Sequence, residues 1–207
     1  MGIRRSPTAP LYGWNEAAGR YITLSTGRFV TFVEVRSALD AAIDSSQNEI
    51  RRLSQALQSG NISLADWQTA MMQEIKQGHL AAIAAAKGGF AELTQADYGR
   101  AGQAIRTQYE YLRNFANQVG DGRQPLDGYF LRRADMYADS SRGLYHRAER
   151  IERAKRGMTE ERRIATARES CPDCIEYEAR GWQPIGSLPN IGDSQCLTNC
   201  KCYFEYR

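Results

Sequence analysis

All five cysteines of this 207-residue chain lie between residues 171 and 202, and the first 170 residues contain none. The cysteine-free part must therefore fold by burying apolar side chains, and a chain of this length can do so without covalent crosslinks. The C-terminal part is punctuated by glycine and proline and is too small for a large core of its own. The cysteine distribution thus divides the chain into a large body and a small appendage.

Four segments of the cysteine-free part have the apolar period of an amphipathic helix. Each has a start signal, a glycine stop, or both: Ser37 with Asp40 and then Gly60; Ser63 with Asp66 and then Gly88-Gly89; Thr94 with Asp97 and then Gly120; and Leu126 to Arg156, followed by Gly157. Long helices with one apolar face bury that face against a neighbour. The sequence therefore predicts a mainly α fold built on an elongated antiparallel helical bundle.

The flanks of the bundle have a different character. Residues 1–20 suggest an extended arm, and the β-branched and aromatic run from Tyr21 to Val35, with a turn at residues 25–27, predicts a short β-hairpin. Thr159-Glu160-Glu161 suggests the cap of a short helix reaching Arg168. We therefore expect three parts: an arm with a hairpin (1–36), the helical bundle (37–169) and a cysteine-rich module (170–207).

The cysteine spacing points to a metal site. A CxxC turn brings Cys171 and Cys174 together, and the second group holds Cys196, Cys200 and Cys202. Four thiolates around one zinc ion are the commonest structural use of such a pattern. We expect a structural Zn²⁺ that folds the module, with two of the three later cysteines as ligands. Disulfides would leave one of five thiols unpaired, and a redox CxxC is the other alternative.

Other signals are weak or missing. The start of the chain lacks the apolar run of a signal peptide, which suggests that the protein is made and kept in a reducing cytoplasm. No apolar stretch is long enough to span a membrane. His79 and His146 lie in predicted helices, and we expect them to serve packing or solvation. No nucleotide, hydrolase or zinc-protease motif is present, so we predict that the chain is not an enzyme.

One part of the chain is markedly basic. Between Arg132 and Arg168 there are eleven basic and six acidic side chains, a net charge of +5 within a chain of net charge +3. Such a stretch can face the phosphates of nucleic acid without reading their sequence, and it can equally be a solvated helix face. Both interpretations stay open at the level of sequence.

The ending CPDC…GWQPIGSLP…CLTNCKCYFEYR resembles the C-terminal signature of the head morphogenesis, or minor capsid, proteins of tailed bacteriophages. The segments GRYITLSTGRFV and DYGRAGQAIRTQYEYLRNFA are similar to phage structural proteins of this kind. Many members carry a histidine just before the final NCxC. Here Leu197 stands near that place beside Cys196, so the resemblance makes Cys196 a candidate substitute ligand.

The resemblance implies a virion protein that is made in the host cytoplasm and assembles in multiple copies. Its partners would be the portal protein, the major capsid protein or both, and the Arg132–Arg168 stretch could touch packaged DNA. The metal would then hold a small module on a helical scaffold, and no membrane would be involved. The alternative is a soluble zinc-containing protein that binds nucleic acid nonspecifically.

Overall fold

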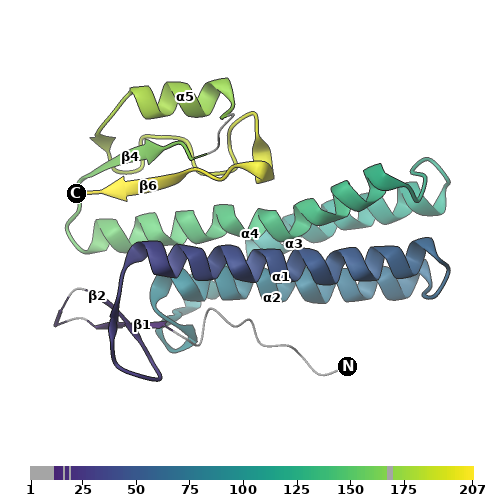
Figure 1. Ribbon diagram of the computed structural model, residues 1–207, viewed down its shortest axis with the longest axis horizontal. Coiled ribbons are helices and arrows are strands. Elements are labelled where there is room, and N and C mark those ends of the chain that lie inside the picture. The colour runs from purple at the N-terminus through teal and green to yellow at the C-terminus, as the bar shows by residue number, and fades with distance from the viewer. Residues whose placement is uncertain (1–11, 16, 19, 167–169) are drawn as a thin grey trace.

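Four long helices form the elongated body of the computed structural model, which describes residues 12–15, 17–18, 20–166 and 170–207 (Figure 1). They are α1 (Phe32–Gln58), α2 (Leu64–Lys87), α3 (Gln95–Gly120) and α4 (Gly128–Lys155), and a single 3-10 turn, η1 (Phe90–Glu92), lies between α2 and α3. The predicted mainly α fold, with a short N-terminal hairpin and a C-terminal cysteine cluster, is confirmed.

Polar caps define where most of these helices begin. The Ser63 side chain accepts a hydrogen bond from the Asp66 amide, and Thr94 and Asp97 form a reciprocal capping box, as the sequence predicts. The carboxylate of Asp127 caps α4 by accepting from the amides of the first turn. Each cap satisfies backbone donors that would otherwise lack a partner at a helix start.

The first helix begins earlier than the sequence suggested. Thr31 is its N-cap: its hydroxyl accepts from the Glu34 amide at 3.2 Å, and the Glu34 carboxylate accepts from the Thr31 amide at 2.5 Å. The prediction of a strand up to Val35, with a cap at Ser37, is therefore wrong. Burial of Val35 and Leu39 against the body outweighs the strand preference of the valines around Glu34.

The N-terminal strands form a small sheet at one end of the body. The strand order is β1-β2-β3, with β1 (Tyr12–Asn15), β2 (Arg20–Thr23) and β3 (Phe29–Val30), all antiparallel. The buried Tyr21 hydroxyl donates to the Ala86 carbonyl at 2.9 Å and thereby ties the sheet to the end of α2. The strand β1 falls within the predicted extended arm; residues 1–11, 16 and 19 of that arm lie outside the described residues.

The centre of the body is an aromatic cluster. Trp67 of α2 meets Phe115 of α3 and Phe130 of α4, with ring centroids 5.5 Å away in both cases, and all three side chains are fully buried. The indole N–H of Trp67 donates to the Ser54 hydroxyl on α1 at 3.1 Å. One residue thus joins all four helices.

The last part of the chain forms a separate small sheet, which we call with its loops the C-terminal module (residues 159–166 and 170–207). The strand β4 (Glu160–Ile164) lies between β5 (Gln183–Pro184) and β6 (Tyr203–Tyr206), and both neighbours are antiparallel to it. The module also contains α5 (Pro172–Ala179) and a 3-10 turn, η2 (Leu197–Asn199). Figure 1 shows it lying along α4.

The predicted short helix from Thr159 to Arg168 is wrong, because residues 160–164 are the central strand of this sheet. Along β4, Glu161 and Arg163 are buried while their neighbours are partly exposed, which is the period of two of a strand. Arg162, on the outer face, pairs with Glu205 across the sheet at 2.8 Å. Residues 167–169, at the end of the predicted helix, lie outside the described residues.

Arg150 and Gly143 of α4 provide two of the contacts that attach the module to this helix. The Arg150 guanidinium donates to the Asn190 side chain at 2.8 Å and to the Leu188 carbonyl at 3.0 Å, and it pairs with Glu161 at 2.7 Å. At Gly143, a Cβ atom would lie 2.9 Å from the carbonyl oxygen of Ile191. The loop that holds residues 188–191 therefore rests directly on the α4 backbone.

We expect Gly143→Ala to push this loop away from α4, because a real Cβ does not approach a carbonyl oxygen that closely. The matched control is Gly102→Ala on α3, where an added Cβ meets nothing within 4 Å. The control should gain about 0.5–1 kcal/mol of unfolding free energy from better helix propensity. Amide hydrogen exchange of residues 188–194 should be faster in the Gly143 variant alone. Equal stabilisation by both substitutions would show that the close contact does not form.

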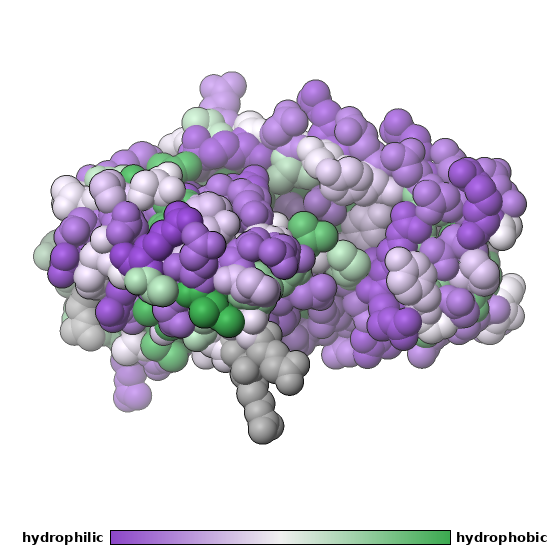
Figure 2. Space-filling model, turned by 90° about the horizontal axis from the view of Figure 1, so that it is seen from above, coloured by the Kyte–Doolittle hydropathy of each residue, from purple (hydrophilic) through white to green (hydrophobic). Residues whose placement is uncertain are grey.

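Within the described residues, no helix is both long enough and apolar enough to cross a lipid bilayer. Seen from above, the surface is mostly hydrophilic and carries only small hydrophobic patches (Figure 2).

Candidate metal centre

The five cysteines come from two short stretches of the sequence, residues 171–174 and 196–202, which meet in the C-terminal module. Cys171 directly precedes α5 and Cys174 lies in its first turn, while Cys196 and Cys200 flank η2 and Cys202 precedes β6. The sulfur atoms form two groups of three, and within each group all three lie within 4.8 Å of one another. The first group is Cys171, Cys174 and Cys196, and the second is Cys174, Cys200 and Cys202, so Cys174 belongs to both. The structure thus brings together all the predicted ligands.

The distances between the sulfur atoms fit a tetrahedral metal site. The Cys171 and Cys196 sulfurs are 3.5 Å apart, and Cys174 lies 3.7 Å from both Cys196 and Cys200. Four sulfurs placed about 2.3 Å from a zinc ion in a regular tetrahedron lie about 3.8 Å from one another. These three separations are close to that value, and each group of three sulfurs within 4.8 Å of one another offers three corners of such a tetrahedron.

Cys174 occupies the central position. It is the one cysteine that belongs to both groups, and its side chain is 1% exposed. Cys200 and Cys202 are also buried, whereas Cys171 and Cys196 are partly exposed. Because the five thiols outnumber the four positions of a closed site, the cluster resembles a structural site more than a catalytic one, which keeps a position open.

The pKa values of the buried thiols are shifted in different directions. Hydrogen bonding from the Cys202 thiol lowers the pKa of Cys200 to about 4, despite its burial. The same contact, together with burial, raises the pKa of Cys202, and burial raises the pKa of Cys174. Within the buried group, the pKa of Cys200 is thus lowered while the pKa values of Cys174 and Cys202 are raised. Binding of a cation would displace the protons of the thiols that it binds.

The two alternatives to a metal site can be compared with this geometry. All five cysteines are free thiols, so the described structure contains no disulfide between them. The CxxC does open a helix, α5, and it follows a strand, which is the setting of redox cysteines that the sequence did not reveal. Three further thiols around that pair, however, are a feature of metal binding and not of a two-cysteine redox centre.

Most cations of the basic stretch have partners inside the protein. Ion pairs link Arg142 to Asp40, Arg147 to Asp193, Arg150 to Glu161, Arg153 to Glu149 and Arg162 to Glu205. Several of these pairs connect α4 to the module or to α1. Much of the positive charge that could face phosphates is therefore used to hold the fold together; Arg168 lies outside the described residues.

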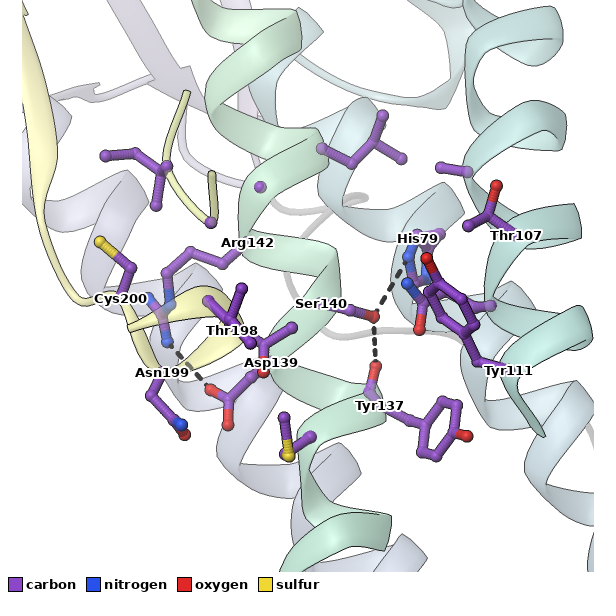
Figure 3. Close-up of a pocket in the computed structure, with 18 of the residues that line it drawn as sticks. His79, Thr107, Tyr111, Tyr137, Asp139, Ser140, Arg142, Thr198, Asn199 and Cys200 are labelled. Atoms are coloured by element: carbon purple, nitrogen blue, oxygen red, sulfur yellow. Dashed lines mark hydrogen bonds and ion pairs between the residues drawn. The ribbon is translucent and has the colours of Figure 1, made fainter. Parts of the chain in front are cut away.

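A cleft of about 1410 Å³ runs between α3 and α4 and ends at the cysteine cluster, since Cys200 lines it (Figure 3). His79, on α2, lies deep in this cleft with its Nδ1 atom 2.8 Å from the Ile75 carbonyl oxygen. Burial lowers the pKa of His79 to about 4, so the ring is neutral at neutral pH. Ser140 lies 3.4 Å from its Nε2 atom but donates to the Tyr137 carbonyl at 2.7 Å. These contacts are those of a packed histidine.

His146 is also buried, within hydrogen-bond distance of Glu149 (3.3 Å), and its ring packs edge-on against Phe204 of β6. It therefore lies where α4 faces the module, and it belongs to neither group of sulfur atoms.

Sequence reasoning missed one charged residue at this site. Arg163 points from β4 to the thiols, and its side chain is completely buried. The alternation of Glu161 and Arg163 on one face of a strand was the available signal, but charged residues on a buried face do not give the usual apolar pattern.

Comparison with protein-family models, with curated proteins and with solved structures finds no match to this chain, so the metal centre rests on its own geometry.

Proposed function

We propose that this chain is a structural component of a tailed-bacteriophage head, a minor capsid or head morphogenesis protein whose C-terminal module is held by one zinc ion. The observation that carries the proposal is the convergence of the five cysteines of the C-terminal signature on one cluster. A signature that merely happened to contain cysteines would have no reason to place them at metal-binding distances.

The choice of zinc rests on the donors. All the candidate ligands are sulfur atoms, and soft thiolates in a closed tetrahedron favour zinc over hard cations such as magnesium or calcium. The ion would connect α5 to the segment around η2, which two hydrogen bonds from Gln195 to Asp173 also join. Its contribution would be to folding, since a module of this size has only a small core: Leu188, Ile191, Phe204 and the buried cysteines.

The helical body suits a scaffold that acts by binding other proteins. Long antiparallel helices give a stiff rod, and three tyrosines on α3 and α4 are about half exposed: Tyr98, Tyr111 and Tyr129. Tyrosine is enriched at protein–protein interfaces because it offers a large contact area at little entropic cost. We expect the partners to be the portal protein, the major capsid protein or both.

Nonspecific nucleic-acid binding has less support. It requires cations that are free to meet phosphates, whereas ion pairs within the protein engage several arginines of the basic stretch.

The test is co-assembly. Head particles from cells that naturally produce this chain are separated on a density gradient, and the chain is quantified by mass spectrometry in each fraction. We expect it to sediment with the portal and major capsid proteins at a fixed ratio. A variant with Cys171 and Cys174 changed to serine should be incorporated poorly, while Gly102→Ala serves as the folded control.

A chain that stays at the top of the gradient while particles form without it would contradict the proposed role. If that same soluble chain bound DNA with an affinity that falls steeply as salt rises, the nucleic-acid alternative would replace it.

A further inference from the structure

The most unusual charge in the module is the guanidinium of Arg163. It is fully buried, with its Nη1 atom 3.4 Å from the Cys174 sulfur and 4.0 Å from the Cys200 sulfur. Among the described residues, no carboxylate forms an ion pair with it. A buried cation is costly unless an anion lies close to it, because the protein interior solvates charge poorly.

The other contacts of Arg163 are all neutral. Nη1 also donates to the Ser194 hydroxyl at 3.0 Å, and Nη2 donates to the carbonyl oxygens of Pro189 at 2.6 Å and Asn190 at 2.9 Å. These three residues belong to the loop that rests on α4, where Arg150 binds Asn190. The Arg163 side chain therefore contacts both the sulfur cluster and the loop of residues 188–194.

The charge of a metal–thiolate centre explains why a cation lies there. A divalent ion with four thiolates has a net charge of −2, and such an anion buried next to Cys174 needs a nearby positive charge. The planar fork of an arginine holds sulfur and two carbonyl oxygens in a fixed arrangement, which the compact ammonium of a lysine does not provide. The anion and the cation each lower the cost of burying the other.

We propose that Arg163 is the counter-cation of the metal–thiolate centre, and that through it the bound metal fixes the loop of residues 188–194 against α4. The inference rests on the metal centre of the proposed function but not on the phage role. Arg163 is a positioning residue in this scheme, since it acts on the metal through the sulfur atoms.

The neighbouring Arg162 provides a matched control. It lies on the same strand but on the opposite face, and it pairs with Glu205 at the surface. The variants Arg163→Met, Arg163→Lys and Arg162→Met are compared with the parent chain. Their zinc affinity is measured by competition with a chromogenic chelator.

We expect Arg163→Met to bind zinc about 10–100-fold more weakly, the range typical of partners that support metal ligands. Arg163→Lys keeps the charge and should recover a large part of this loss, while Arg162→Met should stay close to the parent. An Arg163→Met variant with the parent's affinity, or a lysine variant as weak as the methionine one, would overturn the proposal.

Two further readouts separate this role from simple packing. With metal bound, amide exchange of residues 188–194 should be slow in the parent and fast in Arg163→Met. In the cobalt-loaded proteins, the sulfur-to-metal charge-transfer band should shift in Arg163→Lys, which stays informative if the methionine variant does not fold; an unshifted band would count against a direct effect on the thiolates.

The outcomes also distinguish the two proposals. A parent chain that binds no metal would overturn both the metal centre and the role of Arg163. A parent that binds zinc equally well without Arg163 would overturn the counter-cation alone.

Discussion

Replacing Cys174 with serine is expected to abolish tight metal binding and to unfold the C-terminal module while the helical body stays intact. Cys174 belongs to both sulfur groups and is almost completely buried, so each group is reduced to two sulfurs without it. Serine is a poor zinc ligand, and structural zinc sites supply roughly 10–16 kcal/mol of apparent binding free energy to the segments that they fold. The loss should therefore exceed what the small core of the module can offset.

Metal analysis of the purified proteins checks this result directly. The parent should contain about one zinc per chain, the number that one closed four-sulfur site holds, and the variant close to none. Limited proteolysis should cut residues 171–202 in the variant, while circular dichroism at 222 nm should change little because α1–α4 contain most of the helix. A variant as resistant to protease as the parent would rule out a metal that folds the module.

Ser194→Ala is a useful comparison. Its hydroxyl lies beside the cluster and binds Arg163, but it belongs to neither sulfur group. Zinc content should therefore be retained. Loss of zinc in this variant as well would mean that the module is too fragile for the cysteine result to be specific.

Trp67→Ala should have the opposite pattern, with a large loss of stability in the helical body. The indole is fully buried between Phe115 and Phe130 and bonds to Ser54. Removing a core tryptophan typically costs about 3–5 kcal/mol, through lost burial and the cavity that remains. Urea unfolding followed at 222 nm should show this loss as a lower midpoint.

Two controls define the origin of that loss. Trp67→Phe keeps most of the ring but leaves the Ser54 hydroxyl without its donor, and it should cost about 1–3 kcal/mol. Trp182→Ala removes the same side chain from the partly exposed surface of the module, and it should leave the midpoint of the body unchanged. Equal effects at both tryptophans would argue against an aromatic centre in the bundle.

The helical body could be predicted from the sequence because its signals are local. Apolar period, Ser63 and Thr94 caps and the glycine stop at Gly88 act over one or two turns, and the structure retains all of them. The start of α1 was misjudged since Thr31–Glu34 and Ser37–Asp40 fit the same capping pattern. Only the packing of Val35 into the core, a tertiary effect, decides between them.

The module was harder to predict because its order depends on partners far away in the sequence. The strand β4 looked helical, since its inward residues are the charged Glu161 and Arg163 instead of apolar ones. Each is stabilised by a group that the local sequence does not contain: Arg150 for the glutamate and the sulfur cluster for the arginine. Prediction from apolar periodicity fails at β4, because its two buried residues are stabilised by charged and sulfur partners and not by packing in an apolar core.

The pairing of β4 with β6 also has a consequence for the order in which the parts of the protein fold. A ribosome releases α1–α4 first, and those helices can assemble while the rest of the chain is still being synthesised. By contrast, β4 emerges as an unpaired edge and must wait for residues 203–206 before its central pairing can form. The assembled helices then present Arg150 and the backbone at Gly143, and the loop of residues 188–191 can pack against both as the module folds.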